Sequence, residues 1–275
     1  MLKIIVNCGP AELYIARCLA SILSQSFVDW HAYVTIDPCG DGTHRQASLA
    51  RAGDPRIHIH QNNDRQFTMA NLIQGIRWSA ARSEDVVVVL DGDDWFATPD
   101  ALQIIHDTYR QFDCWMTYGS WVSDQPRMQG MWPAYPEDVS DFRNHQWLGT
   151  AIRTCKRWLW DLIDDRDFRD AKGNYFRVTE DQAAMLPMLE MSGTRKAKHI
   201  QDALMVYNRS SPHACVYTCR DEMLANGEYL KTRPRYSRLL EKPNFESGAL
   251  SFWSPRMDSA RAGTAGWTHD CSSVR

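Results

Sequence analysis

The sequence predicts an α/β domain with a mainly parallel central sheet. In the first half of the chain, short apolar runs rich in β-branched residues alternate with stretches that have the apolar spacing of amphipathic helices. The run Val86–Leu90 contains no polar residue, as expected for a strand buried on both faces of a parallel sheet. Two of the runs end directly in turns rich in aspartate and glycine, which are residues that favour turns.

The first 112 residues carry the clearest elements. Lys3–Val6 is a β-branched run that ends at the Cys8-Gly9-Pro10 turn, and the apolar positions between Leu13 and Leu23 recur with helical spacing. The same criteria predict strands over residues 31–36, 57–60 and 85–90, and helices over residues 69–81 and 99–111. Pro99 suits the first turn of the last of these helices.

Beyond Asp113 the pattern is less regular and richer in Trp, Tyr and Met. Helices are predicted over residues 151–163, 180–191 and 219–231, and a strand over residues 203–208. From Pro243 onward the chain is rich in Ser, Gly, Ala and Arg without periodicity, which predicts a poorly ordered tail. We therefore expect a folded domain over residues 1–215, followed by an irregular C-terminal extension, part helix and part tail, over residues 216–275.

Composition and charge exclude several classes of protein. With 44% hydrophobic and 24% charged residues the chain is neither disordered nor fibrous, and its net charge of −3 gives no general attraction to nucleic acids or anionic membranes. No apolar run approaches the roughly 20 residues of a membrane-spanning helix, and no secretory signal precedes the first turn. The eight scattered cysteines form no C-x-x-C pair and are expected to be reduced. We expect a cytoplasmic protein, whose basic stretch at residues 231–238 is either solvated or peripheral to a membrane or an anionic acceptor.

Three carboxylates lie in the turn Asp91-Gly92-Asp93-Asp94, directly after the most apolar strand. Ligands of open parallel sheets bind beyond the carboxyl ends of the strands, so these side chains lie where a site is expected. Crowded carboxylates repel one another unless a cation neutralises them, and their oxygens suit Mg²⁺ or Mn²⁺ that bridges to phosphates. The alternative is an acidic turn that only caps the following helix.

Two further acidic positions each have a functional and a structural interpretation. Asp37 also follows a predicted strand, where its carboxylate can bind a base or ribose, or simply form an Asp/Gly turn. Thr179-Glu180-Asp181 precedes an apolar helical run, where a carboxylate can accept the proton of a hydroxyl nucleophile. Alternatively, Thr179 caps that helix and the two acids complement its dipole.

Four segments together make the sequence resemble the inverting family 2 glycosyltransferases, which have the GT-A fold. In the family's order these segments are Cys18–Gln25, Tyr33–Asp37 with Asp41–Thr43, Val87–Trp95 with Pro99–Leu102, and Glu180-Asp181. The third is similar to the family's DxD strand and the helix that follows it. The resemblance is strong over residues 3–110, thinner to about residue 215, and stops before the C-terminal extension.

The resemblance implies roles for individual residues. Asp181 is expected to be the catalytic base, and Asp93 is expected to hold Mn²⁺ or Mg²⁺ with His213 completing the metal shell. Asp37 would contact the nucleotide base, Asp91 the ribose or diphosphate, and Arg209 the diphosphate. The expected donor-binding set is Pro10, Asp37, Asp91, Gly92 and Arg209, and the expected acceptor-side set is Trp147, Gly149 and Glu180.

The sequence departs from the family pattern at two places. The loop after Asp37 reads Pro38-Cys39-Gly40 and lacks the family's second Asp, which weakens the expected contact to the base. The Gln-x-x-Arg-Trp signature of processive polysaccharide synthases is absent. A processive synthase is therefore not the expected activity.

The resemblance also implies the architecture and the reaction. The GT-A fold is a single Rossmann-like nucleotide-binding domain, here with a nucleotide-sugar-binding half over residues 1–112 and an acceptor half over residues 113–215. The expected reaction moves a sugar with inversion from a nucleoside diphosphate sugar, foremost a UDP-sugar, to an unidentified hydroxyl acceptor, with nucleic acid only as a modified-base acceptor. The alternatives are a non-catalytic nucleotide-sugar-binding protein of the same fold and a nucleotidyltransferase, although the Cys8-Gly9-Pro10 turn lacks the cationic loop of the latter.

Overall fold

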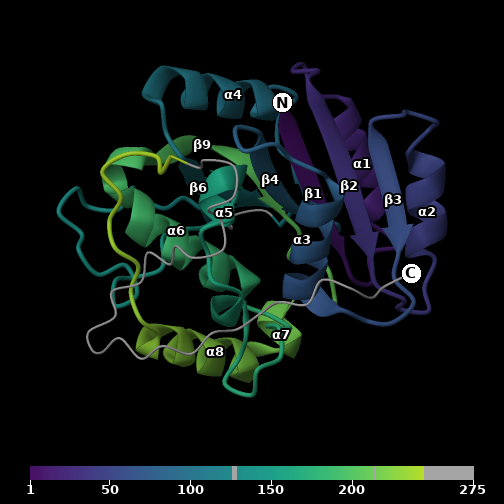
Figure 1. Ribbon diagram of the computed structural model, residues 1–275. Helices are drawn as coiled ribbons and strands as arrows, with labels where there is room; N and C mark the ends of the chain where they lie inside the picture. Colours follow the sequence, from purple (N-terminus) through teal and green to yellow (C-terminus); the bar gives the residue numbers. More distant parts are fainter. Residues whose placement is uncertain (126–128, 214, 245–275) are drawn as a thin grey trace, which may run out of the picture.

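The computed structural model describes residues 1–125, 129–213 and 215–244 (Figure 1). Within these residues nine strands form one mixed sheet in the order β3-β2-β1-β4-β8-β6-β9-β5, with β7 paired to β6. Strands β3, β2, β1 and β4 are parallel, β8 is antiparallel to both of its neighbours, and β9 is parallel to β6. The strands are β1 (Leu2–Cys8), β2 (Trp30–Ile36), β3 (Ile57–Gln61), β4 (Val86–Asp91), β5 (Trp95–Phe96), β6 (Met116–Ser123), β7 (Gln129–Gly130), β8 (Arg153–Lys156) and β9 (Ala197–Tyr207).

The predicted α/β class is confirmed, and each element predicted in the first half is present within a few residues. The helices are α1 (Ile15–Leu23), α2 (Thr43–Ala50), α3 (Phe67–Trp78), α4 (Ala101–Phe112), α5 (Arg157–Trp160), α6 (Glu180–Lys196), α7 (Cys215–Thr218) and α8 (Arg220–Thr232), with a 3₁₀ helix at Asp165–Phe168. The sequence patterns missed β6, α2 and the shorter elements β5, β7, α7 and the 3₁₀ helix. Helix α2 buries only Thr43 and Ala47, so its apolar periodicity is weak. Among the helices of the described residues, none combines the length and hydrophobicity needed to cross a membrane.

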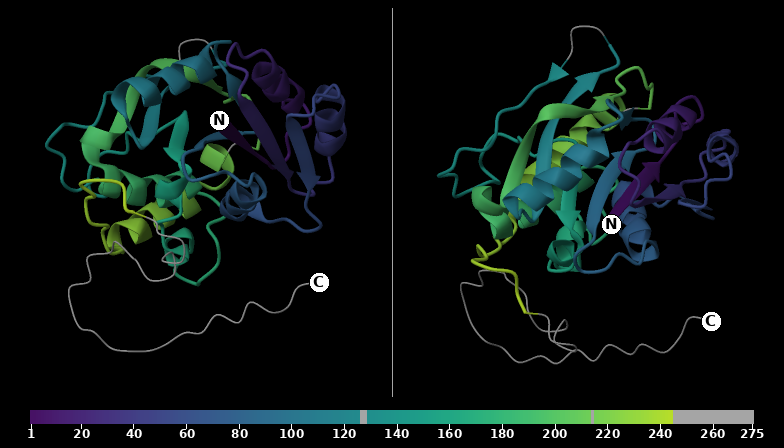
Figure 2. Two further views of the ribbon diagram at one scale, coloured as in Figure 1. Left: turned by 45° about the horizontal axis from the view of Figure 1, so that its top comes forward. Right: turned by 90° about the horizontal axis from the view of Figure 1, so that it is seen from above.

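Helices cover both faces of the sheet. Alternate residues of β4 point to opposite faces: Val86, Val88 and Leu90 belong to the core formed with α1, α2 and α4, whereas Val87 belongs to the core formed with α3, α5 and α6. Because both faces are covered, β4 has no polar alternation, and this is why its sequence signal is so clear. Figures 1 and 2 show the two helical layers around the sheet.

Residues 151–163, predicted as one helix, are mostly not helical. They contain β8, which aligns Arg153 with Val89 of β4 and Thr154 with Thr117 of β6, followed by the short helix α5. The apolar residues of this segment have helical spacing, but the sheet offers β8 a partner on each side, and such non-local pairing overrides local preference. The correction places Arg153 at the edge of the sheet where β4 ends.

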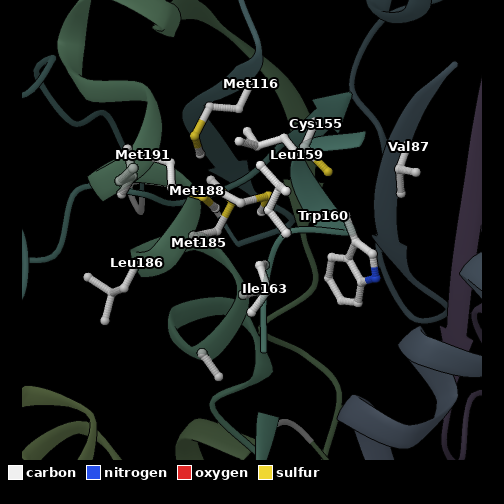
Figure 3. Close-up of a cluster of buried hydrophobic side chains, with 14 of the residues drawn as sticks. Val87, Met116, Cys155, Leu159, Trp160, Ile163, Met185, Leu186, Met188 and Met191 are labelled. Carbon is white, nitrogen blue, oxygen red and sulfur yellow. The ribbon is translucent and has the colours of Figure 1, made fainter. Parts of the chain in front are cut away.

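A methionine-rich core packs α6 against β8 and α5. Met185 and Met188 of α6 lie close to Cys155 of β8 and Leu159 of α5 (Figure 3), and none of the four is more than 3% exposed. Methionine is flexible and polarisable, so it fills space between elements that do not pack with regular geometry. Burial of these side chains fixes α6 against the sheet, and with it the first turn of that helix.

A buried ion pair joins the acceptor half to the segment that follows α8. Arg143, which is 4% exposed, donates through Nε and Nη2 to Glu190 of α6 at 2.6 and 2.9 Å. Its Nη1 donates to the Leu230 carbonyl at 2.9 Å, and the Tyr236 N–H donates to the Glu190 carboxylate at 3.0 Å. One carboxylate therefore connects three segments that are distant in sequence.

The basic stretch at residues 231–238 is engaged within the molecule. Arg233 lies 3.2 Å from Asp167, and Arg235 lies 3.3 Å from Asp141. These contacts differ from the expectation of a solvated or membrane-facing segment, because the acidic partners lie on the same domain. Most of the tail predicted from Pro243 onward, residues 245–275, lies outside the described residues.

Replacing Arg143 with alanine should lower the free energy of unfolding by about 3–5 kcal/mol, because Glu190 would remain buried without its counter-charge. Lys231→Ala is the matched control, since it removes an exposed ion pair with Glu228 and should cost under about 1 kcal/mol. Urea denaturation of both variants measures the difference. Equal losses would contradict a clamping role for the buried pair.

Candidate functional site

A cleft of about 350 Å³ opens at the carboxyl ends of the parallel strands. The register of β1 with β2 and β4 brings the end of β2 and the turn after β4 to the same edge of the sheet. The first turn of α6, the ends of β6 and β9 and the beginning of α8 complete the walls. Of the residues predicted from the sequence, the cleft is lined by Pro10, Asp37, Asp91, Asp93, Glu180, Asp181 and His213.

The turn after β4 is built around Gly92. Its N–H donates to the Asn7 carbonyl of β1 at 2.8 Å, and a Cβ at this position would lie 2.1 Å from the Cys8 sulfur. Only glycine fits so close to β1, so Gly92 acts through packing and does not itself line the cleft. Asp94 is 1% exposed and accepts the Asn208 N–H at 2.8 Å, which ties the turn to the end of β9.

The carboxyl groups of this turn lie close together in a buried environment, which disfavours their charged forms. Burial raises the pKa of Asp93, against the opposing effects of the Ser211 hydroxyl and the charge of His213. Burial also raises the pKa of Asp94, and the neighbouring Asp93 and Asp91 raise it further. One oxygen of Asp94, Oδ2, is buried without a hydrogen-bond partner among the described residues. The turn caps no helix, because β5 follows it directly and α4 begins only at Ala101.

These residues fit a divalent cation shared with a ligand. Within residues 1–125, 129–213 and 215–244, no three His, Cys, Asp or Glu side chains are arranged to hold an ion by themselves. Asp93 and His213 nevertheless both face the cleft, and Mg²⁺ in proteins is commonly held by one or two carboxylates together with substrate phosphates. Asp93, with His213 beside it, would therefore hold the ion, and a phosphate ligand would complete the shell.

Arg153 supplies the positive charge at the base of the cleft, and sequence reasoning missed it. Its Nη2 lies 3.4 Å from Asp91 Oδ2 and its Nη1 lies 3.5 Å from Glu180 Oε1, while its side chain is 11% exposed. Burial raises the pKa of Asp91 to about 7, although the charge of Arg153 lowers it. The residue was hidden by the incorrect helix over residues 151–163, because only the strand β8 brings it to this edge.

Asp181 lies in the first turn of α6, facing the cleft on one side and the apolar core on the other. Burial raises its pKa, Glu180 raises it further, and Arg153 lowers it. Thr179 does not cap the helix: it adopts a left-handed conformation, with φ of 73°, and its hydroxyl caps no N–H at the start of α6 within the described part of the chain. Glu180 and Asp181 do lie in the first turn of α6, where they also complement the helix dipole. A desolvated carboxylate with a raised pKa is suited to accept a proton.

Asp37 shapes the opposite end of the cleft. Its Oδ1 accepts the Asn62 amide at 3.0 Å and the Gln66 N–H at 2.9 Å, and its Oδ2 accepts the Phe67 N–H at 2.9 Å. These bonds hold the loop between β3 and α3 together with the first residue of the helix, Phe67, which has a φ of 63°. The guanidinium groups of Arg65 and Arg177 lie 4.7 and 4.2 Å from the Phe67 ring centre, and all three side chains line the cleft.

Apart from Gly92, three predicted residues lie outside the cleft lining. Trp147 packs against Gly149, where an added Cβ would be 2.7 Å from the Trp147 ring. Gly149 therefore makes room for the Trp147 ring. Arg209 donates through Nη2 to the Tyr217 hydroxyl at 3.3 Å. The aromatic wall is formed instead by Trp121 and Tyr207, whose ring centres are 5.1 Å apart at the ends of β6 and β9.

The chain matches known proteins at two levels. The model of the family described as "Glycosyl transferase family 2" matches residues 4–166, more than half of the chain. Similar solved structures include S. aureus TarS 1–349 in complex with UDP-GlcNAc (16% identity, TM-score 0.57, covering 78% of this chain and 60% of that one). They also include the mannosyltransferase PcManGT from Pyrobaculum calidifontis in complex with GDP-Man and Mn²⁺ (17% identity, TM-score 0.58, covering 82% of this chain and 62% of that one).

The structural matches establish the fold. The chain spans about 60% of the length of these solved structures. Among curated proteins, none matches the chain.

Replacing Arg153 with methionine should destabilise the protein more at pH 8 than at pH 5. The folded-state pKa of Asp91 lies above its unfolded value, so its contribution to stability is lost as the pH rises through about 7, and removing the guanidinium would raise that pKa further. At pH 5 more of the carboxyl groups are protonated and need no counter-charge. Thermal unfolding at the two pH values measures the difference.

Lys156→Met is the control for this variant, because Lys156 lies on the same strand but pairs with Glu84 outside the cleft. It should lower the melting temperature little at either pH. An equal loss at both pH values for Arg153→Met would show that the guanidinium does not compensate the carboxylates.

Proposed function

This chain belongs to glycosyl transferase family 2, and from that premise we propose that it transfers a sugar with inversion from a nucleoside diphosphate sugar to a hydroxyl acceptor. One observation carries the proposal: Asp93 and Asp181, from segments far apart in sequence, face one cleft at the carboxyl edge of the parallel strands. One carboxylate is available to a cation and its phosphate ligand, and the other to an acceptor hydroxyl. The proposed donor is a UDP-sugar; the solved structures hold UDP-GlcNAc in one case and GDP-Man with Mn²⁺ in the other.

The donor would lie across the ends of β1, β2 and β4. Asp37 holds the loop at the end of the cleft where the nucleotide base would lie. Pro10 lines the cleft just after β1. Asp93, with His213, would hold Mn²⁺ or Mg²⁺ against the diphosphate. When bound, such an ion neutralises the charge that develops on the departing diphosphate.

Asp181 would act on the acceptor. Its carboxylate accepts the proton of the hydroxyl while that oxygen attacks the anomeric carbon from the face opposite the diphosphate. The bond from the acceptor oxygen to the sugar forms as the bond from the sugar to the diphosphate breaks, so an α-linked donor gives a β-linked product. Arg153 and Glu180 position the base: their ion pair anchors the first turn of α6 beside β4.

The direct test combines donor binding with turnover. Melting temperatures are measured with UDP-, GDP-, CMP- and TDP-sugars, each with and without Mn²⁺, followed by release of the nucleotide product. A donor at about a hundredfold excess over its Kd adds about 2.7 kcal/mol of stability. Stabilisation by one nucleotide sugar that also requires the metal, followed by nucleotide release, would support the proposal. No stabilisation by any pair would contradict it.

Asp181→Asn should reduce turnover by about 10²- to 10⁴-fold, the usual contribution of a general base, because the amide cannot accept the acceptor's proton. Donor binding should persist, since Asp181 is not needed for the metal or the diphosphate. Nucleotide release and the donor-induced shift in melting temperature measure the two effects. Normal turnover would remove Asp181 as the base.

Asp93→Ala should abolish the metal-dependent part of donor stabilisation as well as turnover, and EDTA should have the same effect on the unmodified protein. Asp107→Ala, which removes an exposed carboxylate of α4, is the control and should leave both unchanged. The measurement is the donor-induced melting shift with Mn²⁺ present. A full shift in Asp93→Ala would place the cation elsewhere.

A further inference from the structure

A second hollow lies on the other side of α3. This groove, of about 680 Å³, is bounded by the end of β3, the outer face of α3 and the loop that carries Tyr175. None of the residues assigned above to the donor, the cation or the proton transfer lines it. Most of the side chains that line the groove are polar, and the rings of Trp78 and Tyr175 lie among them.

Helix α3 and the loop before it form the ridge between groove and cleft. Arg65, Phe67 and Asn71 face the cleft, whereas Gln66, Gln74 and Trp78 face the groove. Asp37 fastens this ridge through the Gln66 and Phe67 N–H groups. The groove therefore has a firm wall whose position is set by the same carboxylate that shapes the cleft.

Two aromatic rings in the groove are held in place by neighbouring side chains. Trp78 is 39% exposed, and its ring lies edge-on to Tyr33, with centres 5.3 Å apart, and to His60, with centres 5.9 Å apart. The Tyr175 hydroxyl donates to Asp165 at 2.7 Å, and the Arg169 guanidinium lies 3.9 Å from the Tyr175 ring centre. Fixed rings lose little conformational freedom when a ligand packs against them.

Polar side chains beside these rings are available for a ligand. The side chains of Asn63, Gln74 and Arg77 make no hydrogen bond to any other described residue. Apart from His60, the charged side chains of the lining are Asp64 and Arg77, so the groove is nearly neutral. Nucleic acids and other polyanions require concentrated positive charge, which this lining does not provide.

We propose that the groove binds a neutral glycan chain. Sugars offer apolar C–H faces that pack on aromatic rings, and hydroxyl groups that pair with amide and guanidinium groups. An exposed Trp and a fixed Tyr beside three uncommitted amide and guanidinium side chains match both requirements. This binding does not depend on the transfer reaction proposed above, and its test is separate.

Affinity gel electrophoresis of the full chain tests the proposal with laminarin, xylan, mannan, dextran and glycol chitin cast in the gel. At least one polymer should retard the unmodified protein, and Trp78→Ala should weaken that binding about tenfold or more. Phe112→Ala, which removes an exposed ring of α4 outside the groove, is the matched control and should migrate like the unmodified protein.

Because Trp78 also packs on Tyr33, a second variant tests the groove without disturbing the core. The double variant Gln74→Ala with Arg77→Ala removes uncommitted polar side chains and should weaken retardation while leaving the melting temperature unchanged. Absence of retardation with all five polymers, or retardation unaffected in both variants, would overturn the proposal. Donor-induced melting shifts, measured on the same samples, report the cleft independently and distinguish loss of glycan binding from loss of donor binding.

Discussion

The site depends on one buried guanidinium that faces several carboxylates. Asp91 ends a strand of the parallel sheet, Glu180 begins a helix of the second half, and Arg153 lies between them. Bringing these acids together without a counter-charge would cost several kcal/mol, because carboxylates lose hydration when buried and repel one another. Arg153 offsets that cost only because β8 is inserted between β4 and β6. The pairing of β8 with β4 and β6 is therefore also what brings the compensating charge of Arg153 to the carboxylates.

The acidic turn after β4 divides its work among its residues. Gly92 allows the close approach to β1, and Asp94 fastens the turn to the residue after β9. Asp91, Asp93 and Asp94 all line the cleft. The packing of Gly92 and the hydrogen bond of Asp94 therefore hold the carboxylates of the turn at the edge of the sheet.

The sequence predicts best where a signal is local. The strand Val86–Asp91 and its acidic turn could be predicted because burial on both faces removes polar alternation. The local pattern at Asp181 fits a helix start as well as a site, and only the family resemblance points to this residue as the base. Arg153 could not be predicted, because its position depends on pairing with strands that are remote in sequence. Trp121 reaches the cleft wall for the same reason, through the pairing of β6 with β9. Trp147, which is predicted on the acceptor side, packs on Gly149 instead.

Asp37 connects the cleft and the groove. Its carboxylate accepts backbone N–H groups at the start of α3 and thereby sets a ridge whose two faces line different spaces. The start of α3 has no side-chain cap from its own N-cap residue, and the carboxylate of Asp37, which follows β2, accepts the free N–H groups instead. Asp37 thus has a structural role, because its hydrogen bonds to the Gln66 and Phe67 N–H groups fix the wall shared by the cleft and the groove.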